Sequence, residues 1–426
     1  MYVVTLDRPW LETPFVFQGF EIKGRDEIEQ LQSYCSYVFV DVARSNLTEA
    51  ELRSLGEDRP KNSFPSSPHF GREDRKRGWL RRFRERMSRM GRAEPPAEST
   101  VTESHAYEIS STVRHEAPQA SAAYEHIVSR CRSIVDQVRN GATIDIDTVT
   151  DAVTPTIDSI LRNPDAMAWT IFSKKKSGRN YSRAVATAVW SIMFGRHLGF
   201  DRESLQDLAM GGLLLDIGMA KLPAEIVNAE GAISDEQYAL IRQHVQLGSG
   251  IVRASAGFSQ NVCDMIRCHH ERADGSGYPD QLLGNAIPIY GRIAGIVDSY
   301  DAMTSKTRYS PALAAYDSAR ELNEMRGKQF QAEVVGQFLK TIGMFPTGSV
   351  VELSDGTVGV VLEQNRVHPL QPKLMLLLDR ARKPYSEPQV LDMHQPEEGN
   401  SGDEPVWIVK GHEHGAFGVD PFNFFA

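Results

Sequence analysis

Hydrophobic residues recur at helical spacing over most of the chain between residues 117 and 345. Apolar residues that return every three or four positions predict amphipathic helices. The clearest such runs cover 121–138, 149–161, 182–197, 203–215, 234–254, 260–268 and 289–304. Asn163-Pro164-Asp165 fits the cap and first turn of another helix, because asparagine accepts from free N–H groups and proline is tolerated at the start. The pattern predicts a helical bundle.

The two ends of the chain have a β-type pattern instead. Residues 3–6 and 37–42 are predicted strands on either side of a short helix near 26–34, which indicates a small α/β module over 1–52. Near the other end, three strands are predicted, with Ser354-Asp355-Gly356 as a hairpin turn. They cover 349–353, 358–361 and 373–378. We therefore expect a mainly α protein with a small N-terminal α/β module and a short C-terminal β appendage.

The remaining domain limits follow from composition. Residues 53–115 are rich in proline, serine and charge without a sustained apolar period, so they predict a disordered linker before a helical domain at 116–345. A β extension at 346–395 and a polar tail at 396–426 complete the chain. Within the linker, 72–92 is basic and amphipathic. Such a segment can lie on an anionic membrane or an acidic partner, but a solvated linker helix is the favoured interpretation.

Charge and cysteine content narrow the function classes. The formal net charge of −9 argues against a nucleic-acid binder. The four cysteines have no metal-knuckle spacing, which indicates a reducing compartment and no disulfide framework. No apolar stretch approaches the ~20 residues that span a bilayer, and no signal-peptide pattern opens the chain. We expect a soluble cytoplasmic protein.

Histidine and aspartate residues recur near the ends of the predicted helices. Metal ions held by imidazoles and carboxylates can neutralise a phosphodiester and activate water for its hydrolysis. Each of these residues alone fits a structural role, as a cap or a hydrogen-bonded polar group. Their order along the chain, with Gly-Tyr-Pro after the histidine pair, favours a metal site built from several helices. The candidate ligands are Asp216, His244, His269, His270 and Asp298.

The run HHERADGSGYPDQLLGNAIP at 269–288 resembles the HD-GYP family, and the resemblance extends over about 117–390. LDRPWLETPFVFQGF, near the start, resembles a domain of unknown function that often precedes HD-GYP domains. The resemblance implies metal-dependent hydrolysis of cyclic di-GMP to linear pGpG, with Fe or Mn as the metal. Asp216, with a metal-bound water, would be the catalytic residue.

Four positions depart from the family's pattern. The histidine of the HD pair corresponds to Leu215 and an upstream histidine to Tyr181. A glutamate falls on Ser177 and a lysine on Met219. The resemblance then implies one complete subsite, made by Asp216, His244, His269 and His270, and a second that keeps only Asp216 and Asp298. One ion is more plausible than two, and a site without metal remains open. On this assignment, restoring histidine at 181 and 215 together would raise the metal content and any hydrolysis.

The resemblance also assigns roles outside the metal ligands. The family's loop borders the substrate cleft and is linked to contacts with diguanylate cyclase (GGDEF) domains. Arg308 is a candidate phosphate-binding residue near positions where the family's usual basic residues are replaced. The loop residues are Asp274, Gly275, Gly277, Tyr278 and Pro279.

Two main functions follow. The first is a phosphodiesterase with a degenerate active site and weak or absent activity. The second is a non-catalytic regulator that binds cyclic di-GMP or a partner protein. A different substrate within the HD superfamily is a third, which the complete GYP motif disfavours.

Overall fold

The structure is a computed structural model, and it describes part of the 426-residue chain. The described residues are 2–6, 20–22, 28, 31, 38–41, 107–175, 182–227, 234–305, 312–365, 368, 370–394, 406–412 and 416–418. The chain forms two compact units, Met1–Lys76 and Arg77–Ala426. Among the described residues, no helix is both long and apolar enough to cross a membrane.

The first unit contains a small antiparallel sheet. Its strands are β1 (Tyr2–Leu6), β2 (Phe20–Glu21) and β3 (Val38–Asp41), in the order β2-β1-β3. Both predicted strands are thus present. Most of the predicted helix near 26–34 and the basic segment 72–92 lie outside the described residues.

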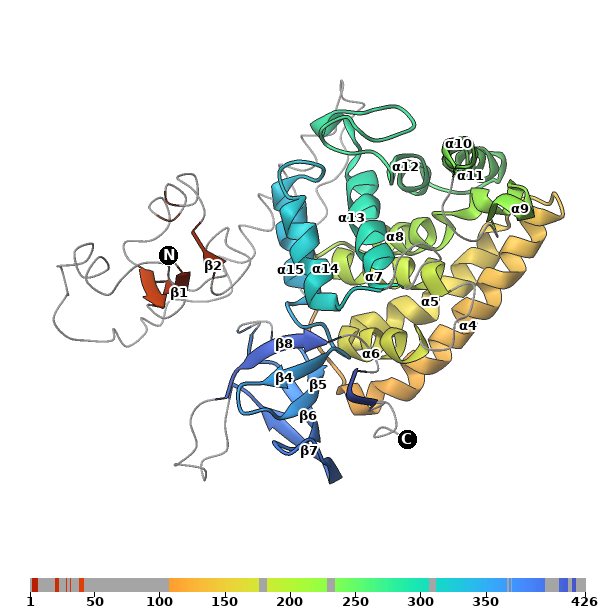
Figure 1. Ribbon diagram of the computed structural model, residues 1–426. Helices are drawn as coiled ribbons and strands as arrows, with labels where there is room; N and C mark the ends of the chain where they lie inside the picture. Colours follow the sequence, from red (N-terminus) through yellow and green to blue (C-terminus); the bar gives the residue numbers. More distant parts are fainter. Residues whose placement is uncertain are drawn as a thin grey trace. The chain divides into compact units, whose positions relative to one another are not determined.

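The second unit is predominantly helical (Figure 1). Its α-helices are α4 (Val113–Arg139), α5 (Ile146–Arg162), α6 (Pro164–Lys175), α7 (Ser182–His197), α8 (Arg202–Leu214), α9 (Ala224–Val227), α10 (Asp235–Arg242), α11 (His244–Ala254), α12 (Gln260–Cys268), α13 (Ile289–Thr304), α14 (Ala315–Glu324) and α15 (Ala332–Ile342). Short 3-10 turns lie at η2 (Ile217–Lys221), η3 (Gly284–Ala286) and η4 (Ala416–Gly418). The predicted helical bundle is confirmed.

Several helix limits agree with the hydrophobic pattern and others differ. α7, α12 and α13 have the predicted bounds, and Asn163 caps α6 by accepting from the N–H groups of Asp165 and Ala166. α4 begins three residues before the expected start of the domain, with Thr112 as its cap. The single helix predicted over 234–254 is instead two helices. A tight turn at Gln243 separates them, so that His244 begins a helix of its own.

The packing of α7, α8, α12 and α13 brings together the elements that carry the candidate ligands. α7 packs on α8 and α13, and α12 packs on the same two helices. The 3-10 turn η2, which continues from α8, lies against α11. Apolar side chains that face inward from these helices are almost completely buried, which holds the helix ends at fixed positions. Fully buried examples are Val185, Val189, Leu205, Leu208, Ile266, Ile293 and Val297.

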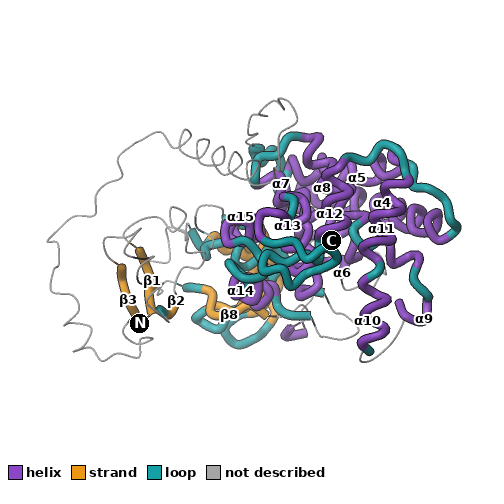
Figure 2. Tube along the Cα trace, turned by 90° about the horizontal axis from the view of Figure 1, so that it is seen from above, coloured by secondary structure: helices purple, strands orange, loops and turns teal. Residues whose placement is uncertain are grey.

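A five-stranded antiparallel sheet follows the helices along the chain. Its strands are β4 (Val350–Leu353), β5 (Val358–Glu363), β6 (Lys373–Leu378), β7 (Pro384–Asp392) and β8 (Ile408–His412), in the order β7-β6-β5-β4-β8. The last strand, β8, lies beside α14 (Figure 2). Trp169 of α6 packs into the core of this sheet. β8 lies within 396–426, where only a polar tail is expected, and it pairs with the free edge of β4. The sheet thus extends beyond the predicted limit at residue 395.

Candidate metal centre

One carboxylate and three imidazoles converge at the ends of three helical elements. Asp216 follows the end of α8, His244 begins α11, and His269 and His270 follow α12. One potential ligand atom from each lies within 4.8 Å of all the others. The Nε2 atoms of His244 and His269 are 3.3 Å apart, and they lie 3.3 and 3.7 Å from Oδ1 of Asp216. These separations suit ligands that share one divalent ion.

Backbone carbonyls fix the orientation of two of the imidazoles. Nδ1 of His244 lies 2.7 Å from the carbonyl oxygen of Ile241, and Nδ1 of His269 lies 2.9 Å from that of Ile266. An Nδ1–H that donates to a carbonyl leaves Nε2 as the lone-pair nitrogen for a metal. Both side chains are almost completely buried. The rings are therefore held in the orientation that a metal ligand requires.

The electrostatics of the group favour a bound cation. Burial would raise the pKa of Asp216, but the hydrogen bond with His244 and the charge of Arg183 outweigh it and hold that pKa well below its usual range. Burial lowers the pKa of His269 and, with the neighbouring imidazoles, that of His270. For His244, burial is outweighed by the hydrogen bond and charge of Asp216, which raise its pKa. Protonation of His244, which its raised pKa favours, would therefore compete with a metal ion for Nε2.

A glycine allows Asp216 to come close to His244. A Cβ atom at Gly218 would lie 1.9 Å from the carbonyl oxygen of His244 and 2.6 Å from the backbone nitrogen of Gly248. Only glycine leaves room for η2 to lie directly against α11 at this point. In the sequence Asp216-Ile217-Gly218, the aspartate provides the carboxylate, and the glycine lets η2 lie close enough to α11 for this carboxylate to reach His244.

Tyr278 of the GYP loop contacts side chains on both the centre and a neighbouring helix. The Tyr278 ring stacks on His270 with ring centroids 4.6 Å apart, and the guanidinium of Arg242 lies over the Tyr278 ring, 4.2 Å from its centroid. Burial raises the pKa of the Tyr278 hydroxyl, which therefore stays protonated. The stack links an imidazole of the centre to an arginine of α10.

Hydrogen bonds from its own backbone hold the loop in shape. The buried carboxylate of Glu271 accepts from the N–H groups of Asp280 and Leu282, at 2.7 and 2.9 Å. Asp274 accepts from both the N–H and the hydroxyl of Ser276. A Cβ at Gly277 would lie within 2.5 Å of backbone atoms of His270, Glu271 and Arg272, so this position requires glycine. The loop therefore packs directly against the backbone of one candidate ligand, His270.

An arginine lies on the other side of Asp216. Nη2 of Arg183, in the first turn of α7, donates to Oδ1 of Asp298 of α13 at 2.5 Å. Its Nε lies 3.6 Å from Oδ2 of Asp216. We call Asp216 with the three histidines the histidine side, and Asp216 with Arg183 and Asp298 the arginine side. Asp298 is not part of the group whose ligand atoms lie within 4.8 Å of one another.

Among the residues that the structure describes, the donor set fits one metal ion and does not fit a second. On the histidine side, a carboxylate oxygen and imidazole nitrogens converge. On the arginine side, Leu215 is buried and has no ligand atom, and a guanidinium faces the two carboxylates. Met219 is part of η2 and is half-buried. Ser177, Tyr181 and Arg308, which sequence analysis also singles out, lie outside the described residues.

Arg183 is not among the residues that the sequence predicted for the site, although a signal for it is present. It is a charged residue at the start of the apolar run of α7, two positions after Tyr181. Its partner Asp298 lies 115 residues further along the chain. Only the packing of α7 against α13 brings them together.

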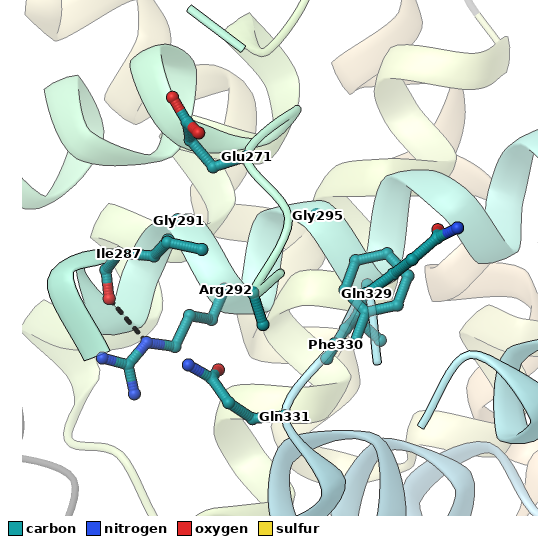
Figure 3. A pocket seen from close by; sticks show the side chains of 10 residues that line it. Glu271, Ile287, Gly291, Arg292, Gly295, Gln329, Phe330 and Gln331 are labelled. Carbon is teal, nitrogen blue, oxygen red and sulfur yellow. Dashed lines mark hydrogen bonds between the residues drawn. The ribbon is translucent and has the colours of Figure 1, made fainter. Parts of the chain in front are cut away.

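A small pocket is lined by residues of the loop, α13 and the segment before α15 (Figure 3). None of the four clustered residues is in its lining. Its lining includes Glu271, Arg292 and Phe330, and Nε of Arg292 donates to the carbonyl oxygen of Ile287. The pocket has a volume of about 10 Å³, which is at the lower limit for one water molecule. It is too small for a nucleotide.

Fold and site together define a helical protein of the HD class, and comparison with known families agrees. Residues 166–334 match the HD domain family, 1–149 match a domain of unknown function, and 350–398 match a KOW domain associated with HD domains. The last match identifies the C-terminal sheet, for which the sequence predicted only a β extension.

Relatives specify the family more narrowly. A cyclic di-GMP phosphodiesterase of Pseudomonas aeruginosa is 32% identical over 281 residues, which is 66% of this chain and 67% of that protein. A cyclic di-GMP phosphodiesterase of Thermotoga maritima is 33% identical over 144 residues, covering 34% of this chain and 39% of that one. A 3'3'-cGAMP-specific phosphodiesterase of Vibrio cholerae is 33% identical over 128 residues, covering 30% and 24%. The chain belongs to the HD-GYP family.

A solved structure is also similar. It is an HDG"Y"P protein from Bdellovibrio bacteriovorus, with a TM-score of 0.44 and 13% identity, covering 79% of this chain and 98% of that one.

Proposed function

We propose that this protein binds cyclic di-GMP at the histidine–aspartate centre and that its hydrolysis of this nucleotide to pGpG is weak or absent. The observation that carries the proposal is the centre itself. Four potential ligands converge for one ion, while a guanidinium faces the carboxylates that would hold another. Membership of the HD-GYP family and the named substrate of the relatives support the choice of cyclic di-GMP.

The residues of the histidine side are suited to hold a divalent metal, of which Fe and Mn are the leading candidates. When bound, such an ion supplies Lewis-acid polarisation of the phosphodiester and a lowered pKa for water. His244, His269 and Asp216 would hold it, and His270 would complete the set. Asp216 also stays ionised, since its pKa lies well below its usual range. It is therefore suited to orient water near the phosphorus atom.

Hydrolysis is expected to be weak because this centre holds one metal ion instead of two. In a two-metal site, both ions stabilise the attacking and leaving oxygens. A guanidinium can neutralise phosphate, but its pKa is too high for it to activate water. If loss of one ion raises the activation barrier by about 3–5 kcal/mol, the rate falls by about 10²–10⁴-fold.

Calorimetric titration of the Mn²⁺-loaded protein with cyclic di-GMP tests this proposal, with chromatographic detection of pGpG in the same sample. We expect binding with little or no product. A parallel titration with 3'3'-cGAMP measures selectivity between the two nucleotides, because relatives include a phosphodiesterase named for each. Absence of binding to cyclic di-GMP, or turnover at the rate of an active family member, would contradict the proposal.

The form of the GYP loop favours a second candidate function, partner recognition. Glu271 and Gly277 hold the loop in a fixed shape, and Leu283 beside it is 65% exposed. A rigid loop with an exposed apolar residue is a common recognition element. Diguanylate cyclase (GGDEF) domains are the partner class that the family suggests. Titration with a purified GGDEF domain, comparing the wild type with Leu283→Asp, tests this function; equal binding by the two proteins would contradict it.

A further inference from the structure

Two carboxylates from different helices face a single guanidinium at the centre. Asp298 comes from α13 and Asp216 from the end of α8, and Arg183 of α7 lies between them, 2.5 and 3.6 Å away. Asp298 is almost completely buried, whereas the Arg183 side chain is 38% exposed. The Arg183 side chain is thus paired with a buried carboxylate and is itself only partly exposed.

Carboxylates that share a site require a positive charge nearby, because like charges at short range repel and resist burial. Restored histidines at 181 and 215 would leave Arg183 in contact with Asp216 and Asp298. A second metal ion would then have to displace a permanently charged group from both carboxylates. The contacts therefore indicate competition between Arg183 and a second ion for the same two residues.

The guanidinium also has hydrogen-bonding capacity to spare. It carries five N–H donors, and within the described ranges its one hydrogen-bond acceptor is Asp298. Nε is buried without a hydrogen-bond partner, although Asp216 lies 3.6 Å from it. A planar guanidinium with free donors matches the oxygens of a phosphodiester in shape and charge.

We propose that Arg183 takes the place of a second metal ion: it neutralises Asp216 and Asp298, limits the centre to one ion, and provides a charged contact for the phosphodiester. The last element rests on the proposed function, since it requires a phosphodiester ligand. The first two concern metal binding alone and are independent of which nucleotide binds.

The number of bound ions tests the exclusion of a second metal. Three full-length proteins are saturated with Mn²⁺ and desalted: the wild type, Tyr181→His/Leu215→His, and the same pair combined with Arg183→Met. We expect about one ion per chain in the first two, in contrast to the gain that the ligand assignment from the sequence predicts for the double-histidine protein, and about two in the third. Elemental analysis measures the ion content. Electron paramagnetic resonance should show an exchange-coupled Mn²⁺ pair only in the third.

Two further variants separate charge from shape. Arg183→Lys on the double-histidine background keeps the positive charge and should still exclude the second ion. Arg183→Gln replaces Arg183→Met if thermal melting shows that the methionine protein does not fold. A second ion bound while Arg183 is present, or no second ion after its removal, would overturn the proposed exclusion.

Cyclic di-GMP binding tests the phosphodiester contact. In calorimetric titrations at fixed Mn²⁺, Arg183→Met should bind the nucleotide about tenfold more weakly than the wild type, with Arg183→Lys between them. Equal affinities for the wild type and Arg183→Met would overturn this contact. If the wild type binds no cyclic di-GMP, the proposed function fails, while the ion counts still decide whether Arg183 replaces a metal.

Discussion

The histidine side and the arginine side share Asp216 but differ in how its charge is balanced. On the histidine side, imidazole nitrogens gather near one carboxylate, so a cation from solution, either a proton or a metal ion, balances its charge. On the arginine side, the cation is part of the chain, and the two carboxylates already face it. The comparison shows that ligand number alone does not decide how many ions a centre holds. A nearby side chain of the right charge can occupy the same place.

Replacement of His269 should have the largest effect, because it removes a ligand from the side that needs an external cation. His269→Ala should lower Mn²⁺ affinity at least about 100-fold, measured by calorimetric titration. His115→Ala, at an exposed position on α4, is the control and should bind as the wild type does. Unchanged affinity in His269→Ala would remove this residue from the metal site.

The close approach of η2 and α11 should be the next most sensitive feature. Gly218→Ala forces a Cβ against the carbonyl of His244 and should cost about 3 kcal/mol in the free energy of unfolding, with loss of bound metal. Gly250→Ala, on α11 with open space around its Cβ, is the control and should stabilise the helix slightly. Equal stability of the two variants would show that the contact is not needed.

The arginine side can be tested by a double-mutant cycle between Arg183→Met and Asp298→Asn. Because Asp298 is almost completely buried, we expect a coupling of about 2 kcal/mol in the free energy of unfolding. The partly exposed pair Arg267–Asp280, in a parallel cycle, should give less than about 1 kcal/mol. A coupling near zero for the first pair would contradict its role as a charge-balanced unit.

The two sides should also differ in their response to pH. The pKa of His244 is raised by Asp216, so a metal ion must displace a proton from it. Mn²⁺ affinity should therefore rise with pH, by about tenfold per unit, until the pH exceeds this raised pKa, and then level off. In the metal-free protein, the stability contributed by protonated His244 is complete below about pH 6.5 and is lost as the pH rises through the folded-state pKa.

The arginine side should not follow this dependence, because a guanidinium stays charged throughout the range. Calorimetric titrations with Mn²⁺ at several pH values between about 6 and 9 measure the effect. The metal-free thermal melts are taken at the same pH values. A flat metal affinity would show that no proton competes for the histidine side.

The stack above the centre should give the smallest effect. Arg242→Gln removes a cation–π contact with Tyr278 and should lower the free energy of unfolding by about 0.5–1 kcal/mol. The number of bound Mn²⁺ ions should not change, since Arg242 is not among the four clustered residues. Loss of metal in this variant would show that the histidine side depends on the loop.

The sequence predicted the helices of the centre well because their cores are strongly periodic. α7, α12 and α13 agree with the apolar runs, and the four residues of the histidine side were recognised from their order and the GYP motif. Other features depend on contacts far along the chain. β8 is a short, partly exposed strand that forms on the edge of β4. Its few residues carry too little hydrophobic pattern to indicate a strand.

The arginine side could not be predicted from the sequence, because it also depends on contacts between residues far apart along the chain. An arginine is not a metal ligand, so its residue type does not indicate this site. Its role depends on Asp298, which only the packing of α7 on α13 brings close. The break between α10 and α11 at Gln243 has no glycine or proline, so the sequence does not predict it. The structure shows it, because His244 begins a separate helix.

The number of ions in the wild-type protein tests the central claim most directly. The full-length chain is saturated with Mn²⁺, desalted and measured by elemental analysis, and cyclic di-GMP turnover is followed in the same sample. The one-ion centre predicts about one ion per chain, with little or no pGpG formed. About two ions per chain with sustained turnover would contradict it, because Asp216 and Asp298 would then bind a second metal ion despite Arg183.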